Sequence, residues 1–572
     1  MIRDLDSHDG DLPTYDVCII GSGAAGGTVA AELSGSGLSV CVLESGVKKV
    51  TRRGDQLKKT ESRGIHVKDY SRERVLGGAT TTWAGLSSPL DPADLEPREF
   101  VEHSGWPLTR AELLPLYAAA AERYRFPELR AFTPEGFGSL RAKGDFSPSW
   151  RVVEEKIFLA ADVPQNFGKE VRDIYDGGAV DLWLDASVAQ LCGQEDHAKL
   201  SGAPSIRHAD VRTRSGRAVR VCARAFVVAT GGIENARLLL NSTDICPAGL
   251  GNERDQVGRF MMNHPKNYSG ILHLAKPVQE LPYYFGCLHE GFAGYGGLRF
   301  PEDELARRGL MNSYVRLEPL FPWSDSEGIE ALVLIAKRSK FFVDRIRKKS
   351  QSEVVELRDY AETGDDSDLQ NQRRSLFGFI PLLFTILLDA PKVTRYLWSR
   401  IVSRKRPLIK RARLRNFMEM EPRPENRVRL ASEVDANGMP LPLVEHDTTP
   451  LDRRSLIELH AVLREEFEEA GVGRLETNLA EADPWPITQD ASHHIGTTRM
   501  GIDPSSSVVN PHQRLHGVAN VYVAGASVFP TSGCANPTFT IVALSIRLAA
   551  TLRDQLSESS AEPSPSPRPE SP

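Results

Sequence analysis

The chain has 572 residues, of which 41% are hydrophobic and 26% are charged, and its formal net charge is −6. This length allows two or three domains with a large core, and the composition is typical of a soluble globular protein. The net negative charge gives no electrostatic reason to bind nucleic acid. The seven cysteines form no clustered pattern, so no metal or iron–sulfur site is expected. Residues 1–14 lack the basic-then-apolar pattern of a secretory signal, which favours a cytoplasmic location.

A strand–turn–helix–strand pattern opens the chain. The apolar run 16–20 predicts a buried strand, a G-x-G-x-x-G turn spans 21–26, and 27–33 predicts a helix. A second strand over 39–44 ends in Glu44. The glycines permit a tight turn and the close approach of a pyrophosphate to the helix N-terminus, and the acid can accept a hydrogen bond from a ribose hydroxyl. This region is therefore predicted to bind a dinucleotide.

Further strands and glycine turns follow. Residues 181–222 alternate between apolar and polar, which predicts several antiparallel strands. Segment 74–85 combines two adjacent glycines, small hydroxyl residues and a tryptophan, so its backbone N–H groups can lie against a flat polar ring. A strand over 225–230 and another over 520–524 each end beside a glycine. We expect these turns to gather around the bound dinucleotide.

Two segments near the C-terminus carry the residues expected to do chemistry. The first, 491–501, contains His493 and His494, and the second, 533–540, contains Asn536 followed by a proline. A base beside a hydrogen-bonding group is what removal of a proton from an alcohol requires. The sequence thus predicts a redox site built from both ends of the chain.

The region 331–411 has an unusual composition. An apolar run over 376–388 lies between an acidic segment, 359–368, and a basic one, 395–415. The run is too short to span a bilayer, which needs about 20 residues. A core or oligomer-contact helix with a solvated basic neighbour is expected, and an amphipathic surface that touches a membrane or a respiratory partner is the alternative.

Six motifs in this order resemble the glucose–methanol–choline (GMC) oxidoreductase family of flavoenzymes. They are GSGAAG at 21–26, GGATTTWAG at 77–85, ATGGIENARLLL at 229–240, VGRFMMNHP at 257–265, HHIGTTRMG at 493–501 and VYVAGASVFPTSGCANPTFTI at 521–541. The resemblance covers nearly the whole chain except 331–411 and the tail. With an asparagine at position 536, the motifs of this chain most resemble those of pyranose oxidases and sugar dehydrogenases.

The resemblance implies an α/β fold, α+β overall, in which a Rossmann-type FAD-binding domain is joined to a second, mostly antiparallel-sheet substrate-binding domain. The expected boundaries are 12–264 with 485–555 for the FAD-binding domain, 265–330 with 412–484 for the substrate-binding domain, 331–411 for a helical insertion that contacts a membrane or an oligomer partner, and 556–572 for a disordered tail.

The resemblance also implies site residues. The family pattern H-x-x-G-T places His493, rather than His494, as the base, and Asn536 as its partner. His264 is expected to shape a turn near the flavin. Thr82 stands where some family members join a histidine covalently to the flavin, so FAD is expected to bind non-covalently. The positions expected to contact FAD are Gly21, Gly23, Ala24, Ala25, Gly26, Glu44, Ser45, Arg74, Gly77, Gly78, Thr81, Thr82, Trp83, Ala84, Gly85, Val188, Ala229, Thr230, Gly231, Asn235, Gly525, Ala526, Asn536, Pro537 and Thr538.

The activity that the resemblance implies is oxidation of a hydroxyl of a sugar, glycoside or sugar-decorated metabolite to the carbonyl. His493 would take the hydroxyl proton, and a hydride would pass to flavin N5, with oxygen or a quinone as the later electron acceptor. One alternative is oxidation of a lipid, sterol or other apolar alcohol, with 376–388 lining the entry. A flavin-binding module without activity is a further alternative, disfavoured because His493 and Asn536 are both present.

Overall fold

The structure is a computed structural model. It describes residues 1–572 except 11, 69–70, 134, 136–145, 147, 162, 194–202, 280, 284–286, 290–291, 322, 325, 339–378, 400–407, 488–491 and 559–572.

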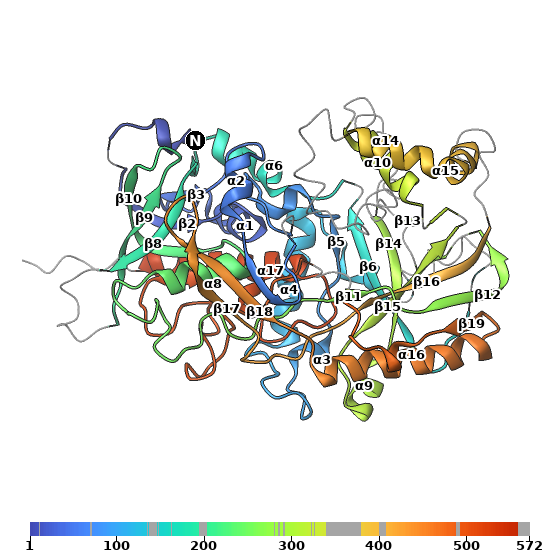
Figure 1. The fold of residues 1–572 in the computed structure, drawn as a ribbon. Coiled ribbons are helices and arrows are strands. Elements are labelled where there is room, and N and C mark those ends of the chain that lie inside the picture. Colours follow the sequence, from blue (N-terminus) through green and yellow to red (C-terminus); the bar gives the residue numbers. More distant parts are fainter. Residues whose placement is uncertain are drawn as a thin grey trace, which may run out of the picture.

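The first sheet contains the predicted dinucleotide-binding unit (Figure 1). Its strands, in spatial order, are β1 (Ile2–Asp4), β7 (Asp181–Leu184), β3 (Val40–Glu44), β2 (Tyr15–Ile20), β10 (Ala218–Val228), β9 (Ile206–Arg212) and β8 (Ser187–Gly193), and β20 (Val521–Val523) also pairs with β10. The strands from β1 to β10 and β20 pair in parallel, whereas β10, β9 and β8 pair antiparallel. Nearly every residue of β2 and β3 is buried, as expected for central parallel strands covered on both faces.

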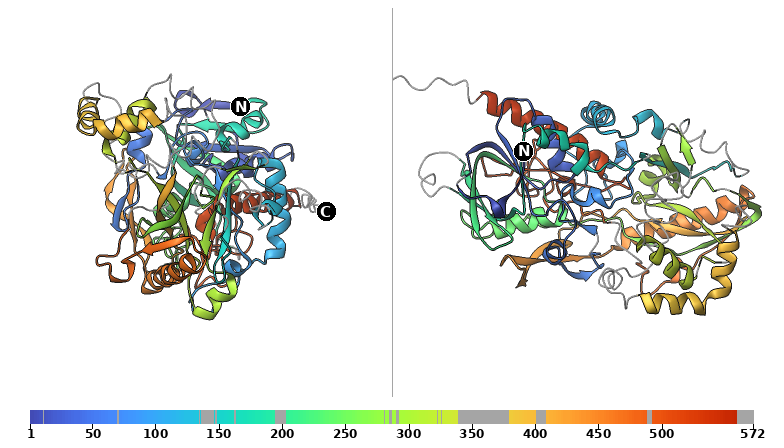
Figure 2. Two further views of the ribbon diagram at one scale, coloured as in Figure 1. Left: turned by 90° about the vertical axis from the view of Figure 1, so that its right-hand side faces the viewer. Right: turned by 90° about the horizontal axis from the view of Figure 1, so that it is seen from above.

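The second sheet is antiparallel throughout its described pairs, as predicted. Its strands are β19 (Gly473–Glu476), β12 (Ile271–Val278), β16 (Ile409–Phe417), β15 (Tyr314–Leu320), β14 (Phe292–Arg299), β6 (Glu154–Ala161) and β5 (Leu86–Ser87), with β11 (Lys266–Asn267) on β16 and β13 (Cys287–His289) on β14. The long helix α16 (Pro450–Glu469) packs its apolar side into the core of this sheet. Figure 2 shows the two sheets side by side along the length of the molecule.

A small third sheet and the remaining helices surround these layers. The third sheet contains β17 (Arg427–Val434), β18 (Pro440–His446) and β4 (Glu61–Gly64). The other α-helices are α1 (Ala24–Leu33), α2 (Arg52–Leu57), α3 (Pro92–Leu95), α4 (Arg110–Tyr124), α6 (Phe167–Glu170), α7 (Arg172–Asp176), α8 (Gly232–Asn241), α9 (Glu302–Arg308), α10 (Glu327–Arg338), α14 (Phe379–Leu388), α15 (Ala390–Leu397) and α17 (Thr538–Glu558). Helix α17 packs against α1, so the two ends of the chain meet beside the first sheet (Figure 1).

Three details differ from the sequence predictions. Helix α1 begins at Ala24, inside the glycine turn, because Gly23 serves as its N-cap. Strands β5 and β6 belong to the second sheet although they come from the range 12–264, since pairing between distant strands leaves no local pattern in the sequence. Residues 556–558, expected in the disordered tail, are the last turn of helix α17, which ends at Glu558. Residues 559–572 lie outside the described residues.

The apolar run near residue 380 forms α14 and is not a core helix. Ile380, Leu383, Phe384, Leu387 and Leu388 are 53–76% exposed. Their spacing places them on one side of the helix, while Ile386 packs toward Trp323, Ile329 and Val393. Within the described ranges, no helix is both long and apolar enough to cross a bilayer.

Candidate active site

A cavity of about 710 Å³ is lined by residues from both sheets, which is a typical volume for a ligand pocket. Most of the predicted residues lie on its wall. They are Gly21, Gly23, Ala24, Ala25, Glu44, Ser45, Arg74, Gly78, Thr81, Thr82, Trp83, Ala84, Val188, Ala229, Thr230, Gly231, His493, Gly525, Ala526, Asn536, Pro537 and Thr538. Segments up to about 500 residues apart in the sequence therefore meet at one cavity, as the two-ended site required.

Glycines form a wall against which a flat or elongated ligand can lie closely. A Cβ at Gly23 or Gly231 would meet no protein atom within 4 Å, so both residues border open space in the cavity. Gly21 has a φ of +104°, and a Cβ there would lie 2.6 Å from the carbonyl oxygen of Ala229. The turn before α1 is thus shaped by its own backbone and leaves room beside the helix N-terminus, which fits a pyrophosphate.

Glu44 is placed as the sequence predicted, and Ser22 is an addition. The Glu44 carboxylate accepts hydrogen bonds from the backbone N–H and the hydroxyl of Ser22, at 3.1 and 2.6 Å, and from the Gly46 N–H at 2.7 Å. Burial raises the pKa of Glu44, and these hydrogen bonds oppose the rise. The Ser22 hydroxyl also accepts from the Gly77 N–H, so it ties the two glycine turns together.

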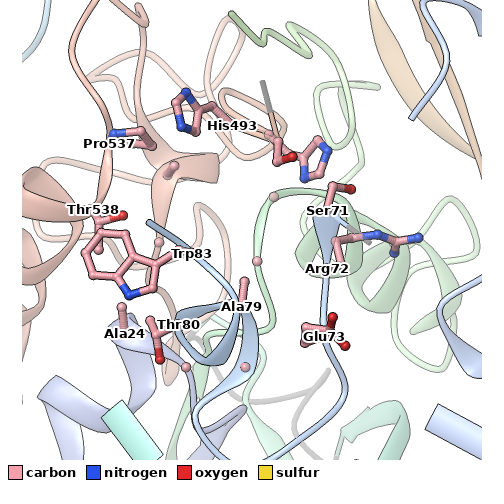
Figure 3. A pocket seen from close by; sticks show the side chains of 18 of the residues that line it. Ala24, Ser71, Arg72, Glu73, Ala79, Thr80, Trp83, His493, Pro537 and Thr538 are labelled. Carbon is pink, nitrogen blue, oxygen red and sulfur yellow. The ribbon is translucent and has the colours of Figure 1, made fainter. Parts of the chain in front are cut away.

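The loop around Trp83 is held by hydrogen bonds to Gln165 and Phe167. The Trp83 indole N–H donates to the carbonyl of Gln165 at 2.6 Å, and the Thr80 hydroxyl accepts from the Phe167 N–H. Figure 3 shows Trp83 beside Thr538, with Arg72 and neighbouring side chains on the other wall. The loop therefore presents an aromatic ring and small side chains to the cavity.

Four predicted contact residues are not among those that line the cavity: Gly26, Gly77, Gly85 and Asn235. They support it instead. A Cβ at Gly26 would lie 2.0 Å from the carbonyl oxygen of Gly21, because helix and strand approach each other closely there. Asn235 is fully buried, and its side chain bonds Thr230, the Ala524 carbonyl and Ser527. The position of a residue within a motif does not show whether it lines the cavity or supports the residues that do.

His493 lies in a hydrogen-bonded chain with His264. The two Nδ1 atoms are 2.8 Å apart, and His264 Nε2 is 2.8 Å from the carbonyl oxygen of Gly533. The Asn263 side-chain oxygen accepts from the backbone N–H groups of both His264 and His493, which fixes their separation. The sequence prediction gave His264 a turn-shaping role and missed this contact, which joins residues 229 positions apart.

This chain of contacts assigns the protons. A carbonyl oxygen can only accept, so His264 must carry its proton on Nε2. Burial lowers the pKa of His264 to about 4, so at neutral pH its Nδ1 holds a lone pair. His493 must then donate from Nδ1 to His264, which leaves the lone pair of neutral His493 on Nε2. That is the form in which His493 can accept a proton from a ligand.

His494 and Asn536 also line the cavity. His494 lies against the start of α8, where a Cβ at Gly232 would be 2.1 Å from the His494 carbonyl oxygen. Ser492, with a φ of +62°, turns the chain just before the two histidines. The choice of His493 over His494, and the role of Asn536, remain predictions that the tautomer assignment favours.

One group of potential metal ligands lies elsewhere. Within the described ranges, Cys192, His208 and Asp210 place their ligand atoms within 4.8 Å of one another on β8 and β9. None of the three lines the cavity. The expected absence of a metal site therefore stays a prediction.

Comparisons with known proteins agree with this geometry. Residues 422–545 match the family model of GMC oxidoreductases. The 6'''-hydroxyparomomycin C oxidase of Streptomyces lividus is 25% identical over 590 residues, which cover 95% of this chain and 92% of that protein. The chain is therefore similar to GMC oxidoreductases over residues 422–545 and to this oxidase over nearly its whole length. The paromamine 6'-oxidase of Streptomyces fradiae is also 25% identical, with 96% of this chain and 93% of that protein covered.

A solved structure shows the same fold. The crystal structure of pyridoxine 4-oxidase from Mesorbium loti aligns with a TM-score of 0.54 at 17% identity, and the alignment covers 94% of this chain and 99% of that chain. The predicted α/β fold with a second antiparallel sheet is confirmed. The family match and the oxidase relatives together confirm the prediction of an enzyme that acts on CH–OH groups.

Proposed function

We propose that the protein oxidises a hydroxyl of a sugar, glycoside or sugar-decorated metabolite to the carbonyl, with FAD as its cofactor. The observation that carries this proposal is the contact between His264 and His493 at the cavity, because it leaves a lone pair on His493 Nε2. Both long relatives reported above are named as oxidases of glycoside compounds. These names favour the sugar class over the lipid alternative.

The residues of the first sheet fit FAD. Gly23 and Gly231 border open space, and Glu44 lies at the end of β3 where a ribose hydroxyl would reach it. Bound FAD supplies the hydride acceptor. Thr82 lines the cavity, and a threonine hydroxyl offers no ring nitrogen for a flavin bond of the kind that histidine makes, which supports non-covalent binding.

The chain's own residues prepare the hydroxyl. His493 Nε2 accepts the proton as the C–H bond breaks, and the resulting positive charge is shared through Nδ1–H with His264. The amide of Asn536 orients the hydroxyl oxygen and stabilises the developing alkoxide. Trp83 and the glycine wall line the same cavity.

The cavity wall argues against an apolar alcohol. Tyr295, Tyr314 and Phe417 line the cavity, and so do Lys266, Arg316 and Arg415. N–H donors on a cavity wall can bond the oxygens of a sugar and have no partner on an apolar chain. Helix α14, expected to line the entry in the lipid alternative, is not among the described lining elements.

The test is anaerobic reduction of the bound flavin by a panel of sugars, glycosides and long-chain alcohols. Proton transfer by a positioned base contributes about 10²–10⁴-fold, so His493→Gln should slow bleaching by a sugar to that extent while the protein stays yellow. His494→Gln is the matched neighbour and should change the rate by less than about tenfold. Bleaching by apolar alcohols alone, or a larger loss in His494→Gln, would refute the proposal.

We propose in addition that the exposed side of α14 contacts an anionic membrane surface. Its apolar residues are followed on α15 by exposed Lys392 and Arg395 and by Trp398, which is 64% exposed. An apolar stripe with flanking cations and an interfacial tryptophan is the chemistry of helices that lie in a lipid headgroup layer. The electron acceptor, oxygen or a quinone, and a cytoplasmic location remain predictions.

Flotation with vesicles tests this contact. Vesicles with phosphatidylserine should carry the protein, pure phosphatidylcholine vesicles should carry less, and Leu387→Glu should abolish the difference. Ile502→Glu is the control, because Ile502 is 78% exposed on another part of the surface. Concentration-dependent dimerisation that Leu387→Glu removes, with no vesicle binding, would assign the stripe to a second copy and refute the membrane contact.

A further inference from the structure

A buried carboxylate holds the backbone segment that His264 contacts. The two ring nitrogens of His264 have different partners, because Nδ1 faces His493 and Nε2 faces the carbonyl oxygen of Gly533. The backbone N–H of Gly533 in turn donates to the carboxylate of Glu419 at 3.2 Å. Glu419 follows β16 by two residues and is fully buried. Gly533 is therefore bonded to Glu419 at its N–H and to His264 at its carbonyl.

Gly533 has little room to move. Its φ is +54°, which favours glycine, and a Cβ there would lie 2.4 Å from Oδ2 of Asp94. Asp94 is 1% exposed, and its carbonyl oxygen accepts a hydrogen bond from the Thr531 hydroxyl at 2.7 Å. The segment that contains Gly533 thus packs closely against one carboxylate and donates a hydrogen bond to another. Its carbonyl oxygen is a fixed acceptor for the ring of His264.

Glu419 is itself fixed and ionised. Arg98 donates two hydrogen bonds to its two oxygens, at 2.9 and 2.8 Å, and the Asn312 backbone N–H donates a third at 2.7 Å. A bidentate contact of this kind sets the orientation of a carboxylate as well as its charge. Burial raises the pKa of Glu419, but Arg98 and the hydrogen bonds outweigh burial and hold this pKa below its ordinary value. Glu419 is therefore an anion at neutral pH.

The charge of Glu419 acts on the histidine pair. Burial lowers the pKa of His264, whereas the charge of Glu419 raises this pKa and that of Lys266 lowers it further. When His493 accepts a proton, the positive charge is shared with His264 through the contact between their Nδ1 atoms. A fixed anion in a buried site stabilises such a charge more strongly than it would in water.

We infer that Glu419 is a positioning residue of the reaction, which fixes the ring of His264 through Gly533. Its negative charge also stabilises the positive charge that the two histidines share once His493 holds the substrate proton. This inference rests on the proposed oxidation and adds a residue that does not line the cavity. The proton passes from the substrate hydroxyl to His493 Nε2, and Glu419 stays ionised throughout.

Glu419→Gln is the principal variant. Glutamine keeps the size of the side chain and an acceptor for the Gly533 N–H, but it removes the charge. Loss of a nearby opposite charge should lower the pKa of the histidine pair by about one pH unit. The acid limb of the pH profile for anaerobic bleaching by a sugar should therefore move down by that amount. A weaker base should also slow bleaching by about three- to tenfold at neutral pH.

A second readout needs no substrate. In protein labelled with ¹⁵N-histidine, the signals of His493 are assigned by their loss in His493→Gln, and their chemical shifts report when the histidine pair gains its proton. The pH midpoint of this change should fall in Glu419→Gln by the same amount as the acid limb. An unchanged midpoint overturns the inference. A lowered midpoint in a protein that no sugar bleaches supports the effect of Glu419 on the histidines and refutes the proposed oxidation.

Glu466→Gln is the matched control. Glu466 is a buried carboxylate on α16 that accepts the backbone N–H groups of Arg151 and Val152, at 2.8 and 3.2 Å, and it does not line the cavity. Its replacement should lower the melting temperature, as Glu419→Gln does, and leave the pH limb and the NMR midpoint unchanged. An equal shift of the midpoint in Glu466→Gln overturns the inference.

A double variant guards against failure to fold. Glu419→Gln leaves Arg98 with an unpaired buried charge, whereas replacement of both partners of a buried ion pair is tolerated better than removal of one. Arg98→Met combined with Glu419→Gln should therefore fold. Because Glu419, and not Arg98, is among the main charges that act on His264, the midpoint should fall in this variant too. A midpoint that stays at the wild-type value in the double variant contradicts the inference.

Discussion

The two walls of the cavity use different parts of the chain. On the wall of the first sheet, Gly23 and Gly231 present backbone and open space, and the nearby Glu44 is held by Ser22. On the wall of the second sheet, Arg316 and Arg415 present long side chains stacked on or near aromatic rings. Backbone contacts read the shape of a ligand, whereas side chains read its charge. The first wall therefore suits a cofactor that many enzymes share, and we expect the second to decide which substrate binds.

The largest effect is expected from a side chain added at Gly23, in the backbone wall. Gly23 has a φ of −70°, which any residue adopts, and its Cβ position is open. Gly23→Val should fold normally and bind FAD at least about tenfold more weakly, because the new methyl groups occupy the pyrophosphate position. The measurement is the ratio of flavin to protein absorbance after gel filtration, together with the melting temperature of the apoprotein.

Gly26→Ala provides the contrast. Its Cβ would overlap the carbonyl oxygen of Gly21, so this variant should lower the melting temperature of the apoprotein itself. If Gly23→Val retains a full complement of FAD, the glycine wall is not where the cofactor lies.

A change at His264, on the side-chain wall, is expected to slow the reaction without loss of the cofactor. His264→Leu removes the acceptor that fixes the tautomer of His493, so kcat should fall about 10–100-fold with KM little changed. His264→Gln keeps a donor and an acceptor and should recover part of the rate. The proposed sugar substrate, followed by stopped-flow bleaching, gives the measurement.

The stability difference between wild type and His264→Leu should also depend on pH. Because the folded pKa of His264, about 4, lies below the unfolded value of about 6.5, its contribution to stability is complete above pH 6.5 and is lost as pH falls through 4. Urea unfolding should show the advantage of wild type over His264→Leu shrinking by roughly 3 kcal/mol across that range.

His460 is the control for both readouts. It is buried on α16, away from the cavity, and burial lowers its pKa to about 3. The stability advantage of wild type over His460→Leu should shrink in the same way as pH falls, and the variant should keep its kcat. If His460→Leu slows bleaching as much as His264→Leu does, the His264–His493 contact has no special role in the reaction.

The two walls also differ in how far the sequence predicts them. The strand–turn–helix unit at 16–44 is local, so its glycines and Glu44 could be placed in order from the sequence alone. The helix begins at Ala24 rather than at residue 27, and Gly26 supports the turn without lining the cavity. Local spacing specifies a backbone shape, but it does not say which side of that shape a ligand occupies.

The second wall could not be predicted in this way. The contact between His264 and His493 spans 229 residues and depends on how two loops are held by Asn263. The basic segment 395–415 was expected to be solvated, yet Arg415 is buried in β16. In a strand every second residue shares one face, so the alternation of Arg413, Arg415 and Phe417 acquires its meaning only from the pairing of β15 with β16.

The late position of β20 and α17 has a consequence for how the enzyme is made. β20 pairs with β10 in the first sheet, and α17 packs on α1, although about 500 residues separate α1 from α17. A nascent chain on the ribosome has the glycine turn early but lacks Asn536 and most of the floor around it until residues 521–558 emerge. The part of the cavity wall that contains Asn536 is therefore not formed until these residues are available.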